Sequence, residues 1–254
     1  MLNRASRLAI KLLRGGSPPK TEYELFLELT RRHPSDKWSA HDYAEPYFRH
    51  FNRLQMVARA VLEIGVGGYE NQEVGYTNPS LGGHSLRFWK DFFPYAEIFG
   101  IDIQDKRSLS EERIEILQGS QVDKEFLKSL VERTGTLDII IDDGSHINHH
   151  VITTFQSLFP SLRTGGLYVV EDTQTSYWAS DYGGDYNNRN NIETIMGYFK
   201  SLTDGLNHAE FPDPHYQPSS YDLNIKSISF CHNLIFVEKG ENRFPSNMIR
   251  RQDS

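Results

Sequence analysis

The sequence has 254 residues, of which 38% are hydrophobic, 24% charged and 12% aromatic, and this globular composition excludes a disordered, collagenous or low-complexity chain. Lys and Arg number 27 against 34 Asp and Glu, which gives a formal net charge of −7. So acidic a chain is a poor candidate for sequence-independent binding of nucleic acid, because that binding needs a cationic face.

Cysteine content and hydropathy bear on the compartment. The single cysteine, Cys231, can form neither an internal disulfide nor a cysteine-based zinc site, and such low cysteine use fits a reducing compartment. No run approaches the roughly 18 apolar residues that a membrane-spanning helix needs. We therefore expect a cytoplasmic protein.

Residues 1–20 form a basic arm, with five Lys and Arg residues and no acid. Apolar residues recur at helical spacing opposite the charges over residues 1–14, a pattern that fits an amphipathic helix in peripheral contact with anionic lipid. The alternative is a short helix docked on its own domain or on a partner, or a frayed end. A secretory signal is not indicated, because charges interrupt the apolar part and no clear small-residue cleavage site follows.

The next residues, 21–240, are interpreted as one domain in which helical and strand patterns alternate. Helical spacing starts at residue 21 and again over 43–60, where Pro46 interrupts or restarts the helix. Short, nearly continuous apolar runs rich in β-branched residues then favour strands covered on both faces. These runs lie at residues 61–66, 98–103, 114–117, 137–143 and 167–172, and helical patterns lie between them at 85–93, 124–133 and 149–162.

The alternation of strands and helices predicts parallel βαβ units with right-handed crossovers, and hence a doubly wound sheet. Two further strand patterns, 225–230 and 234–238, flank His232-Asn233 and predict a C-terminal antiparallel hairpin. The sequence therefore predicts an α/β fold with a mostly parallel, seven-stranded, Rossmann-like sheet. Residues 241–254 contain few apolar groups and are expected to form a tail.

Two long segments, 69–83 and 173–222, interrupt this alternation. Loops of such length are uncommon in a compact domain and often functional. Each follows a predicted strand, and ligands bind at the carboxyl ends of strands in open α/β sheets. We therefore interpret both as lid-like insertions beside a ligand site. In the second, Tyr177, Trp178 and Tyr182 could offer aromatic faces to a sugar or an apolar aglycone, or could pack the lid itself.

A glycine-rich loop, Glu63-x-Gly65-x-Gly67-Gly68, closes the first predicted strand. Glycines let backbone amides approach a ligand without interference from Cβ atoms. A dinucleotide fingerprint would need a small residue three positions after Gly67, and Glu70 stands there. The loop therefore argues for a ligand other than NAD or FAD.

Polar residues end the second and third predicted strands. Asp102 ends the second, where an acid commonly accepts hydrogen bonds from ribose hydroxyls; the alternative is a carboxylate that caps the following turn. Ser120 and Gln121 follow the third strand and would lie near an adenine ring, unless they only form a polar turn. With the glycine loop one strand earlier, Asp102 favours a nucleoside-containing cofactor.

Acidic residues end the fourth and fifth predicted strands: Asp143 after the fourth, and Glu171-Asp172 after the fifth. Adjacent parallel strands lie about 4.8 Å apart, so these carboxylates can face one another across the edge of the sheet. They offer the hard oxygen ligands that Mg²⁺ prefers, and a cation would relieve their mutual repulsion. Because consecutive strand side chains point to opposite faces, Glu171 and Asp172 can both bind one ion only if the chain bends there. The alternative is solvated strand ends or helix caps.

His146 follows Asp143 by three residues. An imidazole with an unperturbed pKa of about 6.5 is suited to deprotonate a hydroxyl group at neutral pH, and a metal ion bound to the same hydroxyl makes that transfer easier. We therefore interpret His146 as a candidate general base. The alternative is a residue at a helix N-terminus with no chemical role, since His149 and His150 follow it closely.

Several motifs in one order resemble a known family. The acidic first-strand motif, the strand-two Asp and the seven-strand pattern are similar to class I S-adenosylmethionine-dependent methyltransferases over most of residues 30–240. The match narrows to metal-dependent sugar O-methyltransferases of natural-product and glycolipid pathways, especially to the catalytic domain of the macrolide deoxysugar (mycinamicin-type) 2-O-methyltransferases. The segments that carry this likeness are 62–69, 119–121, 141–146 and 170–178, with Ser35-Asp36-Lys37 and His41-x-Tyr43 similar to the family's Thr-Asp-Lys segment.

The resemblance implies a role for each motif residue. Mg²⁺ or Mn²⁺ would be held by Asp143, Glu171 and Asp172, and His146 would be the proton acceptor. S-adenosyl-L-methionine would be bound by Ser35, Glu63, Gly65, Gly67, Gly68, Tyr69, Ser85 and Asp102, with Ser120, Gln121 and Asp143 beside it.

The sequence thus predicts an enzyme that transfers a methyl group from S-adenosylmethionine to a sugar hydroxyl of a glycosylated natural product or glycolipid. Two alternatives stay open: a metal-dependent catechol or phenol O-methyltransferase, and a non-catalytic S-adenosylmethionine-binding module. A homo-oligomer is expected. The sequence lacks the extra N-terminal domain of the macrolide enzymes, so assembly inferred from that domain does not carry over.

Overall fold

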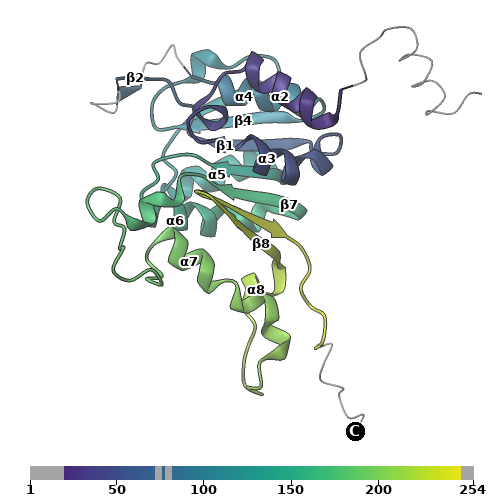
Figure 1. Ribbon diagram of the computed structural model, residues 1–254, viewed down its shortest axis with the longest axis vertical. Coiled ribbons are helices and arrows are strands. Elements are labelled where there is room, and N and C mark those ends of the chain that lie inside the picture. The colour runs from purple at the N-terminus through teal and green to yellow at the C-terminus, as the bar shows by residue number, and fades with distance from the viewer. Residues whose placement is uncertain (1–19, 72–75, 78–81, 247–254) are drawn as a thin grey trace, which may run out of the picture.

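The computed structural model describes residues 20–71, 76–77 and 82–246. The predicted amphipathic pattern of residues 1–14, much of the first insertion and the end of the tail lie outside these described residues. At the centre of the described chain is one seven-stranded sheet with helices on both faces (Figure 1).

The sheet has the strand order β5-β4-β1-β6-β7-β9-β8. Its strands are β1 (Ala60–Ile64), β4 (Glu97–Asp102), β5 (Ile114–Gln118), β6 (Leu137–Asp142), β7 (Leu162–Val170), β8 (Ile225–Cys231) and β9 (Leu234–Lys239). The first five neighbours in this order run parallel, whereas β9 is antiparallel to both β7 and β8. The predicted α/β fold, with its mostly parallel sheet and C-terminal hairpin, is confirmed.

Helices cover the two faces of the sheet in sets of three. One face packs against α2 (Glu22–Arg32), α3 (Ala44–Phe51) and α4 (His84–Phe92), and the other against α5 (Lys124–Thr134), α6 (Asn148–Leu158) and α7 (Ile195–Ser201). Consecutive strand side chains point to opposite faces, so Val61 of β1 joins the first core and Leu62 the second. Both residues are fully buried, as expected for strands covered on both sides.

Shorter elements connect this frame. They are β2 (Tyr69–Asn71), β3 (Tyr76–Thr77), α8 (Ser220–Asn224) and the 3₁₀ turns η1 (Asp36–Trp38), η2 (Asn52–Leu54), η3 (Arg107–Leu109), η4 (Phe159–Ser161), η5 (Thr173–Tyr177) and η6 (Asp204–Glu210). Among the described helices, none combines the length and the apolar character that crossing a membrane requires.

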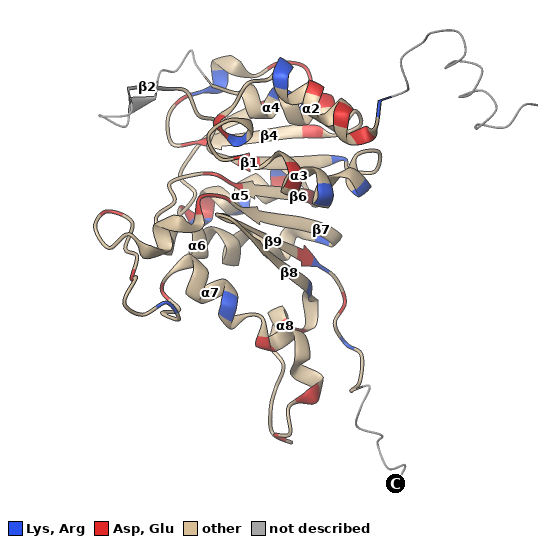
Figure 2. Cartoon of the chain, in the orientation of Figure 1, with Lys and Arg blue, Asp and Glu red and all other residues tan. Residues whose placement is uncertain are grey.

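The first two helices begin where local sequence favours it. Thr21 and Glu24 form a reciprocal capping box at the start of α2, and its acidic first turn and basic last turn complement the helix dipole (Figure 2). Pro46 lies in the first turn of α3, where no helical hydrogen bond is lost, so it does not interrupt the helix. The helix predicted over 43–60 ends at Phe51, because the chain must turn back and enter the sheet at Ala60.

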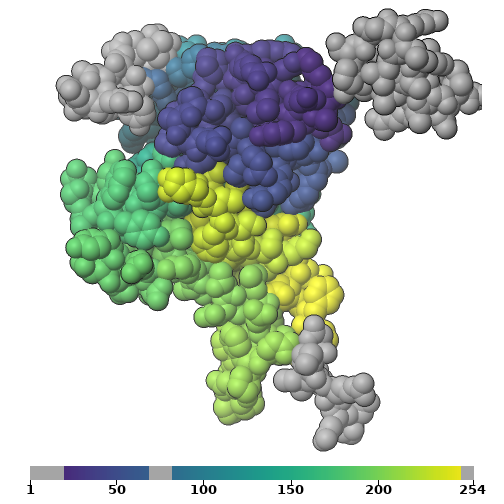
Figure 3. Space-filling view, viewed as in Figure 1, coloured from purple at the N-terminus to yellow at the C-terminus, as the bar shows by residue number. Residues whose placement is uncertain are grey.

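The second insertion is partly built into the domain. Its helix α7 buries Ile195 and Phe199 completely against the sheet. Farther along, the part around η6 projects from the body, and Figure 3 also shows the N-terminal helices lying against the C-terminal strands. The segment that follows β9 returns to this projection, since the Asn242 amide donates to the carbonyl oxygens of Leu206 and Asp222.

Candidate active site

Two neighbouring cavities lie at the carboxyl ends of the parallel strands. Cavity A, of about 320 Å³, is lined by residues that include Ile64, Gly119 and Ser145. Cavity B, of about 420 Å³, lies beside the segment 34–37. Gly65 and Asp102 line both, so the two spaces meet at the ends of β1 and β4. Ligands bind at this edge in open α/β sheets, where the strand order reverses.

Gly65 allows the chain to turn sharply after β1, close to the ends of the neighbouring strands β4 and β6. Its backbone has φ +91° and its N–H donates to the Ile101 carbonyl oxygen at 2.9 Å. A Cβ atom at this position would overlap the Asp143 carbonyl oxygen. Any other residue would therefore suffer both backbone strain and a clash at the wall of the cavities.

Asp102 performs the turn-capping role that the sequence left open, and it also faces both cavities. One carboxylate oxygen accepts from Val66 N at 3.0 Å and the other from Gln104 N at 2.8 Å. These bonds fix the carboxylate at the cavity wall, with further acceptor capacity left for a ligand.

Most residues predicted to bind the cofactor line one of the cavities. Cavity B is lined by Ser35, Gly65, Gly67, Gly68, Ser85, Asp102 and Asp143, and cavity A by Ser120 and Gln121 together with Gly65 and Asp102. Glu63 is different, because it is fully buried and accepts a hydrogen bond from Trp89 Nε1 at 2.7 Å. Tyr69 begins β2, and its side chain lies outside the described part of the structure.

Gln121 uses its amide group to brace the loop after β6. Its nitrogen donates to Asp142 Oδ1 at 3.2 Å and to Thr154 Oγ1 at 3.1 Å, while its oxygen accepts from Ser145 N at 2.8 Å. The side chain therefore holds the cavity wall in place through internal contacts.

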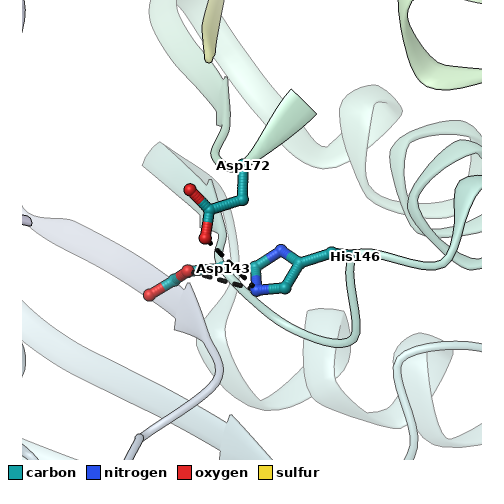
Figure 4. A group of neighbouring side chains, drawn as sticks. All are labelled: Asp143, His146 and Asp172. Atoms are coloured by element: carbon teal, nitrogen blue, oxygen red, sulfur yellow. Dashed lines mark ion pairs between the residues drawn. The ribbon is translucent and has the colours of Figure 1, made fainter. Parts of the chain in front are cut away.

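An outer cluster of Asp143, His146 and Asp172 borders cavity B. His146 Nε2 lies 3.8 Å from Asp143 Oδ1 and 3.7 Å from Asp172 Oδ2 (Figure 4). Both His146 and Asp172 have left-handed backbones, with φ of +56° and +52°, so the chain bends after β7 as the metal hypothesis required. Such strain is typical of residues held in place for function.

Tyr43, at the start of α3, orients Asp172. Its hydroxyl donates to Asp172 Oδ1 at 2.7 Å, and His41 Nδ1 lies 3.5 Å from the same oxygen. Burial, and then the hydrogen bond to Asp172, raise the pKa of the Tyr43 hydroxyl, which keeps it a donor. With Oδ1 held in this way, Asp172 Oδ2 faces His146.

An inner cluster lies behind the outer one and contains Lys37, Glu63, Asp143 and Glu171. The Lys37 ammonium is 2.8 Å from Glu171 Oε1, 3.2 Å from Glu63 Oε1, and paired with Asp143. Burial acts to lower the pKa of Lys37, but the three carboxylates together raise it well above its usual value. Burial also raises the pKa of Glu171 well above its usual range, and the Asp143 charge adds to this.

The three acids predicted to share one ion are thus divided between the clusters. Asp143 belongs to both, Asp172 to the outer cluster and Glu171 to the inner one. Glu171 accepts from the Tyr47 hydroxyl and is not among the residues that line cavity B. The three ligand atoms of each cluster lie within 4.8 Å of one another.

Sequence reasoning missed three residues of this site. Lys37 was noted only as part of a motif, and Tyr43 and Tyr47 had no assigned role. The spacing of the two tyrosines, four positions apart, was the available signal, because such residues lie on the same side of a helix.

The outer cluster can act in two ways. Carboxylate oxygens from Asp143 and Asp172 suit a hard divalent cation, and the His146 imidazole can accept a proton. His146 Nδ1 is buried and has no hydrogen-bond partner among the described residues. The ring is therefore held by packing and by the two carboxylates that face Nε2.

The sheet order, the glycine loop after β1 and the paired cavities at the carboxyl edge define a class I methyltransferase fold. No protein-family model matches the chain. It is similar to the mycinamicin VI 2''-O-methyltransferase of Micromonospora griseorubida, with 46% identity over 217 residues, which cover 85% of this chain and 52% of that protein. It is also similar to the 8-demethyl-8-alpha-L-rhamnosyl tetracenomycin-C 2'-O-methyltransferase of Streptomyces olivaceus, with 45% identity, covering 89% of this chain and 57% of that protein.

A solved structure agrees with these relatives. The MycE methyltransferase from the mycinamycin biosynthetic pathway, in complex with Mg, SAH and mycinamycin VI, superposes with a TM-score of 0.81 and 40% identity, covering 98% of this chain and 62% of that one. The chain spans about half the length of the curated relatives it matches. It is a homologue of the mycinamicin-type sugar O-methyltransferases, as its motifs suggested.

Proposed function

We propose that the protein is an S-adenosylmethionine- and Mg²⁺-dependent O-methyltransferase that methylates a sugar hydroxyl of a glycosylated small molecule. One observation carries this: two joined cavities lie at the carboxyl edge, and one of them, cavity B, borders a cluster of two carboxylates and one imidazole. The names of the relatives, which give mycinamicin VI and a rhamnosyl tetracenomycin as their substrates, support the sugar acceptor.

The cavities divide the cofactor between them in this proposal. Asp102, at their junction, would accept hydrogen bonds from ribose hydroxyls, while Ser120 borders the space for the base. Ser35 and Ser85 line the space for the amino-acid part. When bound, S-adenosylmethionine supplies an activated methyl group, so the protein's contribution is to position and desolvate the acceptor.

The outer carboxylates are the proposed core of the metal site. Asp143 and Asp172 present hard oxygens at the wall of cavity B, and Glu171, next in the chain, would be the third ligand. Mg²⁺ or Mn²⁺ bound there would act as a Lewis acid that lowers the pKa of an acceptor hydroxyl. The strained backbone at Asp172 supports this assignment, because its carboxylate lies within 4.8 Å of the ligand atoms of Asp143 and His146.

His146 is the proposed general base. Its Nε2 faces Asp143 and Asp172, whose carboxylates stabilise the imidazolium that forms when the ring takes the hydroxyl proton. His146 also lines cavity B, which is the proposed acceptor space.

The aromatic side chains predicted to meet the acceptor lie close along the chain to this cluster. Trp178 is 48% exposed and packs edge-on against Tyr182, with ring centroids 5.5 Å apart. Asn148, two residues after His146, donates to the Tyr182 carbonyl oxygen at 2.8 Å and so ties this segment to α6. We assign Tyr177, Trp178 and Tyr182 to contacts with the sugar or its aglycone.

The test is mass spectrometry of macrolide and rhamnosyl glycosides, incubated with isotope-labelled S-adenosylmethionine with and without a chelator. The proposal expects one labelled methyl group on the glycoside, none on the free aglycone, and none with chelator. Methylation of the aglycone alone would favour a phenol O-methyltransferase. Tight cofactor binding without product across the acceptor panel would favour a non-catalytic module.

The His146→Ala variant tests the base. Without the imidazole, no side chain takes the proton of the sugar hydroxyl, so turnover is expected to fall about 10²- to 10⁴-fold. Cofactor binding measured by calorimetry is expected to stay unchanged. His149→Ala is the matched control. Undiminished turnover by His146→Ala would remove His146 from the role.

Other expectations stay predictions from the sequence. They are the domain limits, a cytoplasmic location, self-association, and contact of residues 1–14 with a membrane.

A further inference from the structure

Lys37 is a deeply buried cation beside the proposed metal site. Its side chain is 2% exposed, yet its ammonium contacts Glu63, Asp143 and Glu171. Two of these three acids are the proposed metal ligands Asp143 and Glu171. An amino group therefore already stands among oxygens that a divalent ion would use.

The surrounding fold holds this ammonium in place. Lys37 lies in η1, where its N–H is capped by Ser35 Oγ at 3.3 Å, and its carbonyl oxygen accepts from Tyr43 N at 2.8 Å. Two further donors complete the cluster, Tyr47 to Glu171 and Trp89 to Glu63. The backbone of Lys37 is therefore tied on both sides, and its buried side chain is held beside the three carboxylates by their ion pairs.

Electrostatics gives this arrangement a consequence for metal binding. Three carboxylates within 4.8 Å of one another repel strongly unless a cation neutralises them. The ammonium does so, but it also repels a divalent ion on Asp143 or Glu171, and this repulsion is only weakly screened in a protein interior.

We propose that Lys37 is a positioning residue that acts as the built-in counter-cation of this site: it holds Asp143 and Glu171 in place without metal, and it competes with the divalent ion for their oxygens. The inference rests on the proposed function only in taking Mg²⁺ as the ion. It assigns to Lys37 a control over metal affinity that packing alone would not give.

The experiment compares Lys37→Met with the wild-type protein by Mg²⁺ titration calorimetry, without cofactor or acceptor. The variant is expected to bind Mg²⁺ about tenfold more tightly or better, because the competing charge is gone. Without metal its Tm is expected to fall by about 10 °C, since removing one partner of a buried ion pair leaves the others uncompensated. Millimolar Mg²⁺ is expected to restore most of that loss.

Lys106→Met is the matched control, because Lys106 is also fully buried and precedes η3. It is expected to lower Tm without tightening Mg²⁺ binding. Equal Mg²⁺ affinity in Lys37→Met and wild type would overturn the proposal and leave Lys37 a packing residue.

If Lys37→Met does not fold, the double variant Lys37→Met/Glu171→Gln keeps the charge balance and is compared with Glu171→Gln alone. The double variant is expected to bind Mg²⁺ more tightly than the single one, and equal affinities would again overturn the proposal. No arm measures methyl transfer, so wild-type protein that binds Mg²⁺ but makes no product would contradict only the proposed function. Failure of both wild type and Lys37→Met to bind Mg²⁺ would contradict the inference as well.

Discussion

Tyr43 and Tyr47, four positions apart at α3, each contact a different one of the two consecutive acids after β7. Tyr43 donates to Asp172 at the cavity, whereas Tyr47 donates to Glu171 in the interior. The left-handed backbone at Asp172 makes this division possible, because it turns one carboxylate outward while the other stays with Lys37. At the scale of single residues, therefore, the site depends on partners that take no part in the chemistry.

The Tyr43→Phe variant tests this support. It removes the donor to Asp172 Oδ1 but keeps the ring that stacks on His41. Loss of such a partner typically costs about 10- to 100-fold in metal affinity or activity, and we expect that loss in both Mg²⁺ binding and kcat/KM. Tyr95→Phe, at an exposed ring, is the control; a Tyr43→Phe protein with wild-type Mg²⁺ affinity would show that Asp172 needs no such support.

Gly65 allows a second prediction at this scale. Gly65→Ala places a Cβ against the Asp143 carbonyl oxygen in a backbone of φ +91°, so it should both unfold more easily and lose cofactor binding. Gly135→Ala is the matched control, with φ +69° but no atom within 4 Å of the added Cβ. The control should cost about 1–3 kcal/mol from backbone strain alone, and urea denaturation should show a larger loss for Gly65→Ala. Equal losses would mean that the loop relaxes around the methyl group.

At the scale of elements, Asn148 connects α6 to the second insertion. Its fully buried amide donates to the carbonyl oxygens of Thr175 and Tyr182, and its oxygen accepts from Ile195 N at 2.7 Å. One side chain thereby fixes η5, the aromatic segment and the start of α7. The insertion behaves as part of the domain near α7 and as a tethered loop near Trp178.

Replacing Asn148 with Ala should release that loop. The buried Ile195 N–H would lose its partner, which costs about 1–3 kcal/mol when it stays unsatisfied. The carbonyl oxygens of Thr175 and Tyr182 would each lose one of two donors, and urea denaturation should report a loss of about 1–3 kcal/mol. Limited proteolysis should cut within 177–192 sooner than in wild type. Asn187→Ala, at an exposed position, should change neither readout; unchanged proteolysis in Asn148→Ala would show that other contacts hold the loop.

The hydrogen bonds of Asp222, in the projecting part around α8, predict that the stability of the fold depends on pH. Asp222 is buried, which acts to raise its pKa, but hydrogen bonds from the Tyr216 hydroxyl and from Ser219 lower the pKa below its usual value. A carboxyl whose pKa is lower in the folded state stabilises the fold above its unfolded pKa of about 3.9 and loses that contribution as the pH falls below it. We expect Asp222→Asn to be less stable than wild type at pH 7, with the difference shrinking toward pH 3. Tm curves against pH would measure this, and a difference independent of pH would contradict it.

For the molecule as a whole, the sequence predicts the frame better than the site. Runs such as Ile139-Ile140-Ile141 mark strands buried on both faces, and the positions of Gly65, Asp102 and Asp143 follow from where those strands end. Sequence periodicity does not predict the contacts inside the site, because it carries no information on which distant side chains share the same interior space. The pairing of Lys37 with Glu63 and Glu171 is a contact between such distant side chains. Glu171, which the sequence predicted as a metal ligand, is paired with this lysine.

The helix predicted over 43–60 fails for a related reason. Its apolar spacing continues past Phe51, but exposed Met56 and Val57 belong to a turn that carries the chain to β1. Local helix propensity gives no information about where the sheet lies, so the tertiary structure decides where the helix ends.

The tyrosine contacts join early and late parts of the chain, since Tyr43 and Asp172 are 129 positions apart and Tyr47 and Glu171 are 124 apart. Lys37 and both tyrosines are therefore synthesised before five strands of the main sheet, β1, β4, β5, β6 and β7, and their acids follow only after these strands. Contacts of such long range form slowly, because the loops they close are costly in entropy. Glu171 and Asp172 follow β7 directly, whereas β8 and β9 come later in the chain. The contacts around Lys37 can therefore form only after all the parallel strands have been made.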